Sequence, residues 1–277
     1  MLEDAPACGQ ICYDAFSTIN QAHNFPCDFP GPEVTTGVLS MMFSAPDFYC
    51  VVAESDGRIV GSNCLDERSV IAGVGPITVD PGVQSAGIGR ALMQAVIERA
   101  KERRAAGVRL VQAAFHNRSL SLYTSLGFDV QEPLACMQGK TLQRSVAGCK
   151  VRAASPADVS ACNALSYRVH GFDRGTELEQ AIQAGTAKVV ERDGRITGYA
   201  TALAFFAHAT AETNPDLKAL IASAESFVGS GILVPTRNSD LFRWCLANGL
   251  RVVQPMTLMS TGLYNQPAGA FLPSISF

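Results

Sequence analysis

Gln84, Gly87 and Gly89 are the residues of this chain whose types and spacing are best suited to hold a ligand. An apolar run ends just before them at Asp80-Pro81, and a run of good helix formers begins just after them at Ala91, so we predict a strand, a glycine loop and a helix. The N–H groups of such a loop point inward, the helix dipole adds positive potential, and glycines let a phosphate approach the main chain. The stretch therefore predicts an anion site.

Two common nucleotide-binding motifs do not describe this loop. A mononucleotide loop ends in Gly-Lys-Ser/Thr, whereas this one ends in Gly89-Arg90-Ala91. A dinucleotide loop has three glycines spaced G-x-G-x-x-G, and the spacing here is Gln84-x-x-Gly87-x-Gly89. For the loop taken alone, a plain helix cap is the alternative explanation.

A second polar segment follows one strand later. Val108 to Ala114 is apolar enough for a strand, and Asn117 to Leu126 is predicted to be a short helix that Gly127 stops. Asn117 is expected to be both the helix N-cap and a ligand-binding residue. For Tyr123 the alternative to a functional role is that of a packed helix tyrosine.

In this order the two segments resemble the signatures of the GNAT acetyltransferases, Gln/Arg-x-x-Gly-x-Gly/Ala and Asn-x-x-Ala/Ser-x-x-x-Tyr-x-x-x-Gly-Phe. The resemblance to the second pattern is inexact between Asn117 and Tyr123, around Ser121 and Leu122. The resemblance implies acetyl-CoA as the cosubstrate, with its pyrophosphate on the loop and its pantetheine arm along the main chain of the preceding strand. The residues expected to bind it are Ile77, Thr78, Val79, Gln84, Ser85, Ala86, Gly87, Ile88, Gly89, Arg90, Asn117 and Tyr123.

The resemblance also implies a direct attack of an amine on the thioester, with Tyr123 giving a proton to the departing thiolate. An alkylamine has a pKa of about 10, so a carboxylate or a water chain must first remove its proton. Asp66 and Glu67 interrupt the apolar pattern before the loop and are the predicted bases. The alternative for both is the solvated end of a hairpin.

Three functions remain open from the sequence. The first is an N-acetyltransferase acting on an amine of a small molecule or peptide, and as a member of such a family the chain is expected to form a homodimer. The second is a noncatalytic acyl-CoA sensor, against which Tyr123 argues, because sensing needs no acid at the sulfur. The third is an assembly protein that presents the tail from Leu263 to Phe277.

Composition excludes several other classes of protein. A net charge of -3 with a pI near 5.8 argues against nucleic-acid binding, which needs clustered Lys and Arg. No apolar run is long enough to span a bilayer, and the chain begins acidic, unlike a signal peptide, so a cytoplasmic location is expected. The 9 cysteines form no C-x-x-C pair and are expected to be reduced, and the 4 histidines lack metal-ligand spacing, so no metal site is predicted.

The rest of the first half contains the elements that must position the loop. We predict a helix from Asp4 to Phe16, an irregular loop from Ile19 to Gly37 that is suited to line a pocket, and a helix from Val38 to Phe43. A hairpin then joins strands at Phe48 to Glu54 and Arg58 to Leu65 through Asp56-Gly57. After Phe128 a last strand leads into a polar linker at 139–148.

The second half repeats the first without its chemistry. Asp158 stands 154 residues after Asp4, Asp193-Gly194 stands 137 after Asp56-Gly57, and Trp244 stands 121 after Tyr123. No Gln/Arg-x-x-Gly-x-Gly occurs between Tyr199 and Asn238. An indole N–H is also a far poorer proton donor than a phenol, so the second unit is expected to be degenerate.

The predicted fold is therefore α/β (α+β). It consists of two tandem GNAT-like units, each a mixed, mostly antiparallel twisted sheet flanked by helices, at 1–140 and 149–277. The strand predicted at Val151 to Ala154 would have its counterpart before Met1. We therefore expect either a start upstream of Met1, or a sheet edge of the first unit that is left open or filled by another segment.

Overall fold

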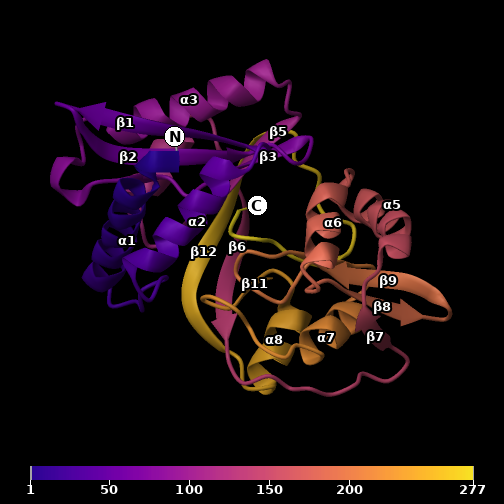
Figure 1. Ribbon diagram of the computed structural model, residues 1–277. Helices are drawn as coiled ribbons and strands as arrows, with labels where there is room; N and C mark the ends of the chain where they lie inside the picture. The colour runs from indigo at the N-terminus through magenta and orange to yellow at the C-terminus, as the bar shows by residue number, and fades with distance from the viewer. Residues whose placement is uncertain (1, 277) are drawn as a thin grey trace. The chain divides into compact units, whose positions relative to one another are not determined.

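The computed structural model describes residues 2–276, and their contacts divide the chain into two units (Figure 1). Unit 1 comprises residues 2–129, 259–263 and 276, and unit 2 comprises residues 130–258 and 264–275. These units do not coincide with the expected ranges 1–140 and 149–277. Nearly all of the last strand of the first repeat groups with unit 2, and the last residues of the corresponding strand of the second repeat group with unit 1.

The sheet of unit 1 has the strand order β1 (Phe48–Ser55), β2 (Arg58–Asp66), β3 (Ile71–Val74), β5 (Gly107–Ala113) and the end of β12 (Arg251–Gly262). The short β4 (Thr78–Val79) pairs with β2. The β1–β2, β2–β3 and β2–β4 pairs are antiparallel, and β3–β5 is parallel. The predicted mixed, mostly antiparallel sheet is confirmed.

Helices cover both faces of this sheet (Figure 1). Alternate residues of a strand point to opposite faces. Cys50 and Cys64 pack with α1 (Ala5–Ala22) and α2 (Pro32–Ser44), while Tyr49 and Leu65 pack in the cluster that contains Met93 of α3 (Ile88–Glu102) and Tyr123 of α4 (Asn117–Ser125).

The prediction of a long irregular loop from Ile19 to Gly37 is wrong. Helix α1 continues to Ala22, and α2 begins at Pro32, because proline is tolerated in the first turn of a helix, where its missing N–H is not needed. The remaining loop at residues 23–31 is tied to α1 by buried Asn20, whose Nδ2 donates to Pro26 O and to Asp28 Oδ2, each over 3.1 Å.

Unit 2 contains a sheet in the order β13 (Ala270–Leu272), β10 (Ala209–Ala211), β9 (Arg195–Ala200), β8 (Lys188–Arg192) and β7 (Lys150–Ala153). Its other strands are β11 (Ile232–Pro235), which pairs with β6 (Asp129–Gln138), and the first part of β12. Its helices are α5 (Val159–His170), α6 (Gly175–Gln183), α7 (Asn214–Ala222) and α8 (Ser239–Ala247). Three short 3-10 helices, η1 (Leu2–Asp4), η2 (Pro81–Val83) and η3 (Pro156–Asp158), complete the described chain.

The hairpin repeat predicted from the sequence is confirmed in detail. Asp56 and Gly57 have φ of 52° and 73°, and Asp193 and Gly194 have φ of 52° and 75°. Positive φ at both central residues is the geometry of the tight turn that matches strand twist. Both hairpins also shift register three residues before the first turn residue, between Ala53 and Glu54 and between Val190 and Glu191.

The predicted equivalence of Trp244 and Tyr123 is wrong by one residue. Both α4 and α8 end in a Schellman motif, in which Phe128 N–H donates to Tyr123 O over 3.0 Å and Leu250 N–H donates to Cys245 O over 3.1 Å. Superposing the two motifs pairs Tyr123 with Cys245. The second repeat therefore has a buried thiol, rather than an indole, at the position of the tyrosine.

At the start of unit 1, the residues described before α1 form only η1, and β1 is the edge of the sheet. Helix α5 follows strand β7 in the second repeat, and the equivalent helix α1 follows no described strand. Among the described residues, no strand of unit 1 therefore lies beyond β1 at this edge of its sheet.

Candidate active site

The loop between β4 and α3 is held in shape by its own polar side chains. Asp80 accepts a hydrogen bond from Gly82 N–H over 2.8 Å and pairs with Arg58 at 3.2 Å. Gln84 Nε2 donates to Val79 O over 3.1 Å, which fixes the loop to the end of β4. Ser85 and Gly87 have φ of 74° and 85°, so the chain turns through the left-handed region twice before the helix begins. The glycine at position 87 meets that requirement without steric cost.

The N-terminus of α3 carries no side-chain cap. Its N-cap residue is Gly87, no side chain accepts from its first N–H groups, and its first turn contains no acidic residue. Ser85, Ala86 and Gly87 are exposed, and an added Cβ at Gly87 would meet no heavy atom within 4 Å. Uncapped N–H groups at the positive end of a helix dipole suit a phosphate. The residues present therefore fit the pyrophosphate of coenzyme A.

Two arginines bring α3 and α4 together around this loop. Arg118, in the first turn of α4, donates to Gln84 Oε1 over 3.1 Å and to Ser85 Oγ over 2.9 Å. Arg90, in the first turn of α3, donates to Ser125 Oγ over 2.9 Å. Both arginines are exposed and add positive charge beside the helix N-terminus. The sequence analysis missed Arg118, because nothing in the local pattern reveals a contact that spans more than thirty residues.

Asn117 is the first residue of α4 and directly precedes Arg118, but it is not the N-cap that the sequence predicted. The cap is His116, whose Nδ1 accepts from Ser119 N–H over 3.2 Å. Burial lowers the pKa of His116 below its usual value, which keeps the ring neutral. With Nδ1 accepting, the proton of the neutral ring lies on Nε2, so His116 is poorly suited to act as a base in this state.

Tyr123 lies on α4, and it is buried among the apolar residues that pack between α3 and the sheet. Burial raises the pKa of its hydroxyl to about 12. The phenol is therefore protonated throughout the neutral range, which suits a proton donor and not a base.

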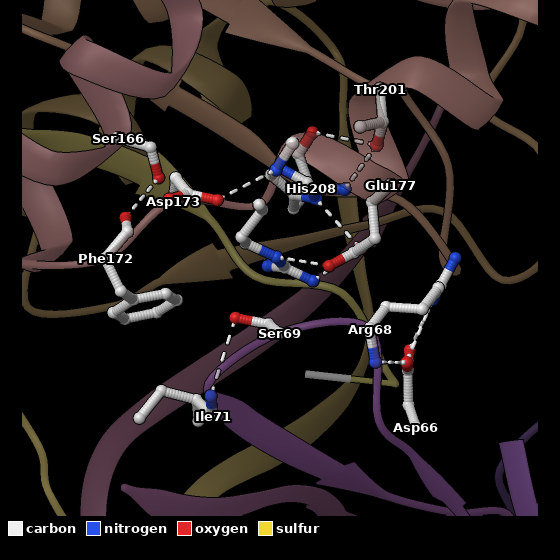
Figure 2. Close-up of polar contacts among 12 residues, drawn as sticks. Asp66, Arg68, Ser69, Ile71, Ser166, Phe172, Asp173, Glu177, Thr201 and His208 are labelled. Carbon is white, nitrogen blue, oxygen red and sulfur yellow. Dashed lines mark hydrogen bonds and ion pairs between the residues drawn. The ribbon is translucent and has the colours of Figure 1, made fainter. Parts of the chain in front are cut away.

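The two predicted bases are both held in ion pairs. Figure 2 shows the Asp66 carboxylate beside Arg68, whose Nε donates over 2.9 Å. Glu67 accepts from Arg99 of α3, with Nε to Oε1 at 2.7 Å, and lies 3.8 Å from Arg103. Only 8% of the Glu67 side chain is exposed. Neither carboxylate is the solvated hairpin end that was the alternative interpretation, and each has a guanidinium partner.

The strands beside the loop separate where the ligand arm is predicted to run. The parallel ladder between β3 and β5 ends at the pair Gly73 and Arg109. Strand β4 then pairs with β2 through Thr78 and Val79, and β5 has only β3 and β12 as neighbours in the described sheet. Ile77 lies just outside β4. Among the described strands, the main chain of residues 78–79 thus pairs with β2 and forms no ladder with β5.

Other kinds of site receive no support from the described residues. No helix within residues 2–276 is long and apolar enough to cross a membrane, and no cluster of three or more His, Cys, Asp or Glu side chains there is arranged to hold a metal ion. The 9 cysteines are all free thiols. A cavity of about 380 Å³ in unit 2 is lined by linker and α7 residues such as Arg144, Cys149 and Ala219, none of which belongs to the predicted site.

Comparison with known proteins agrees with this geometry. Residues 16–128 match the model of the Acetyltransferase (GNAT) family. No protein in the curated collection matches the chain.

Three solved structures are similar to the chain over nearly its whole length. A proposed acetyltransferase from Pyrococcus horikoshii has a TM-score of 0.73 at 18% identity, with 98% of this chain and 92% of that chain covered. A GCN5-related N-acetyltransferase from Sphaerobacter thermophilus has a TM-score of 0.61 at 16% identity, with 100% and 96% covered. A tandem GNAT protein from the clavulanic acid biosynthesis pathway has a TM-score of 0.56 at 15% identity, with 94% and 95% covered. The chain therefore has the tandem architecture predicted from its repeat.

Proposed function

We propose that this chain, whose residues 16–128 belong to the acetyltransferase (GNAT) family, transfers an acetyl group from acetyl-CoA to an amine of a small molecule or peptide. The match of residues 16–128 to that family supports an acyltransferase. The observation that supports acetyl-CoA as the acyl donor is the uncapped N-terminus of α3, with Arg90 and Arg118 beside it. The loop binds the pyrophosphate through its N–H groups, and the main chain of residues 77–79 takes the pantetheine arm.

Acetyl-CoA supplies a thioester, whose carbonyl carbon the amine nitrogen attacks while the carbon–sulfur bond breaks. The proton lost by the amine goes to a base, and the thiolate, with a pKa of about 8.5, receives a proton or a hydrogen bond from Tyr123. The raised pKa of Tyr123 keeps its hydroxyl protonated through the neutral range.

Asp66 and Glu67 stay the predicted bases, and their ion pairs give each a second role. The ion pair of Glu67 with Arg99 joins the end of β2 to α3. Glu67→Gln is therefore expected to lower the melting temperature as well as the rate of acetyl transfer. Asp66→Asn is the matched variant, since its arginine partner is only two residues away on the same segment. Loss of the acidic limb of the pH–rate profile in one variant alone would identify the base, because a structural effect lowers the rate at all pH values.

The first test is calorimetry of acetyl-CoA with the wild type and Gly87→Trp, combined with thiol release across a panel of amines. We expect binding that is lost in the variant, and thiol release with one class of amine. No binding to the wild type would refute the assignment of the loop. Binding without release for any amine would support the acyl-CoA sensor instead.

Tyr123→Phe tests the proton donor separately. We expect kcat to fall by roughly a hundredfold, because acid catalysis typically contributes that much, while the affinity for acetyl-CoA stays within about twofold. An unchanged kcat would show that Tyr123 is only a packed helix tyrosine with no role in catalysis. A cytoplasmic location and a homodimer both stay predictions.

A further inference from the structure

One buried side chain of unit 1 has no partner for either of its polar atoms. Gln112 of β5 is 6% exposed, and within residues 2–276 neither its Nε2 nor its Oε1 makes a hydrogen bond. A primary amide has two N–H donors and an acceptor oxygen. Leaving such a group unpaired in the interior costs roughly 1–3 kcal/mol, and nearly all buried polar groups of native proteins are paired. A partner from outside the chain is therefore expected.

The position of Gln112 indicates which partner that is. It lies three residues past Arg109, where the ladder with β3 ends, and β4, which follows β3 in the chain, pairs with β2 and not with this part of β5. By alternation it shares the face of Val108 and Leu110, and both pack with Met93 and Tyr123 in the cluster beneath α3 and α4. Its amide thus belongs to the side of the strand on which Tyr123 lies.

A ligand that joins the loop to Tyr123 must pass this region. If its pyrophosphate is on the N-terminus of α3 and its sulfur is at Tyr123, the intervening arm runs along the separation between β4 and β5. The arm of coenzyme A carries two amide groups, each with one N–H and one carbonyl oxygen. A glutamine amide can both donate to and accept from such a group, which an apolar side chain cannot do.

We propose that the side-chain amide of Gln112 binds an amide group of the coenzyme A arm and positions the thioester. This inference rests on the proposed function of the loop. It adds a side-chain contact to the arm, in addition to the main-chain contacts of residues 77–79. Because Gln112 offers both a donor and an acceptor, it favours a ligand with an amide-bearing arm over an unsubstituted nucleotide.

The test compares coenzyme A with adenosine 3′,5′-bisphosphate, which keeps phosphate groups but lacks the arm. In Gln112→Met, which preserves length and volume, we expect the dissociation constant for coenzyme A to rise about tenfold, as for one lost hydrogen bond. The dissociation constant for the bisphosphate should stay within about twofold. The melting temperature without ligand should be equal to or higher than that of the wild type, because an unpaired buried polar group has been removed.

Asn63→Leu is the matched control for a buried amide with a structural role. Asn63 is fully buried, and its Nδ2 donates to Leu92 O over 3.3 Å, so its loss should lower the melting temperature. An unchanged affinity of Gln112→Met for coenzyme A would overturn the proposal and leave water as the partner. A parallel loss of affinity for both ligands, or a lower melting temperature, would also overturn it by showing a structural role. Failure of the wild type to bind either ligand would instead refute the function proposed for the loop.

Discussion

The N-termini of α3 and α7 occupy equivalent places in the two repeats, but only the first turn of α7 contains an acidic residue. The third residue of α3 is Arg90, and no side chain caps the helix. The third residue of α7 is Asp216, which is fully buried and accepts from Thr197 Oγ1 over 2.7 Å, from Arg192 Nη2 over 3.1 Å, and from the Thr213 hydroxyl. Unit 2 thus supplies its own anion where unit 1 leaves the place for a ligand.

The difference shows how a binding site of this kind is lost. A helix N-terminus favours negative charge whether that charge belongs to a phosphate or to a carboxylate of the chain. Once a buried aspartate is held there by two hydroxyls and an arginine, the helix gains stability and loses its capacity for a phosphate. The comparison therefore predicts that unit 2 contributes stability and unit 1 contributes ligand binding.

The largest expected effect follows from removing the internal anion of unit 2. Asp216→Ala leaves Arg192 without a carboxylate and two hydroxyls without an acceptor, so we expect a loss of about 3–5 kcal/mol of stability. Scanning calorimetry measures it, and the affinity of unit 1 for acetyl-CoA should be unchanged below the transition. An unchanged melting temperature would show that the contacts of Asp216 contribute little to stability, and it would weaken the comparison of the two helices.

The converse change gives unit 1 the residue that unit 2 has. Arg90→Asp places a carboxylate at the third position of α3, and repulsion of the pyrophosphate is expected to cost about 2–3 kcal/mol of binding, or roughly a hundredfold in affinity. Arg90 is exposed, and an acid in the first turn favours the helix, so the melting temperature should not fall. Arg90→Ala is the control, with a smaller loss. Full affinity of the aspartate variant would show that the ligand does not lie at this helix.

A smaller effect is expected from Gly87→Ala. With φ of 85° at this position, a side chain costs about 1–2 kcal/mol, and the added methyl also projects from the exposed loop. Gly127→Ala is a matched control, because Gly127 has φ of 89° and follows the C-terminus of α4 rather than belonging to the loop. Both variants should lose similar stability, and only Gly87→Ala should lose affinity for acetyl-CoA. Equal losses of affinity would show that strain alone explains both.

The smallest expected effect concerns the two helix caps. His116 caps α4 only when Nδ1 is unprotonated, whereas the amide oxygen of Asn238 caps α8 at any pH. Burial lowers the pKa of His116 in the folded state, so its contribution to stability is complete above the unfolded pKa of about 6.5 and is lost as the pH falls. His116→Asn should remove up to about 1 kcal/mol of this pH dependence, measured from melting temperatures between pH 8 and pH 5. An unchanged dependence would mean that another group titrates.

The elements of the site could be predicted because each has a local pattern. The glycine loop, the hairpin turns and the stop at Gly127 depend on the backbone preferences of the residues themselves. The wrong prediction of the α4 N-cap has the same origin. Asparagine is the stronger capping residue, and Asn117 stands next to His116, which caps the helix. The one-residue error in matching Trp244 to Tyr123 followed from that choice.

The contacts that complete the site could not be predicted, because they join residues far apart in the chain. Arg118 reaches Ser85, and Arg99 reaches Glu67, through packing of whole helices on the sheet. Gln112 lies among apolar strand residues, and only its burial and unpaired amide distinguish it. The sequence shows that a carboxylate precedes the loop, but only the folded structure shows whether an arginine pairs with it.

Grouping of residues 259–263 with unit 1 has a consequence for synthesis of the chain. The end of β12 is a neighbour of β5, so the sheet beside the loop between β4 and α3 lacks one strand until residues 259–263 have left the ribosome. At typical rates of translation, the interval between synthesis of β5 and of these residues is on the order of ten seconds. During it the unfinished edge of β5 is open to pairing with other nascent chains, so chaperone demand should be greatest before residues 259–263 emerge.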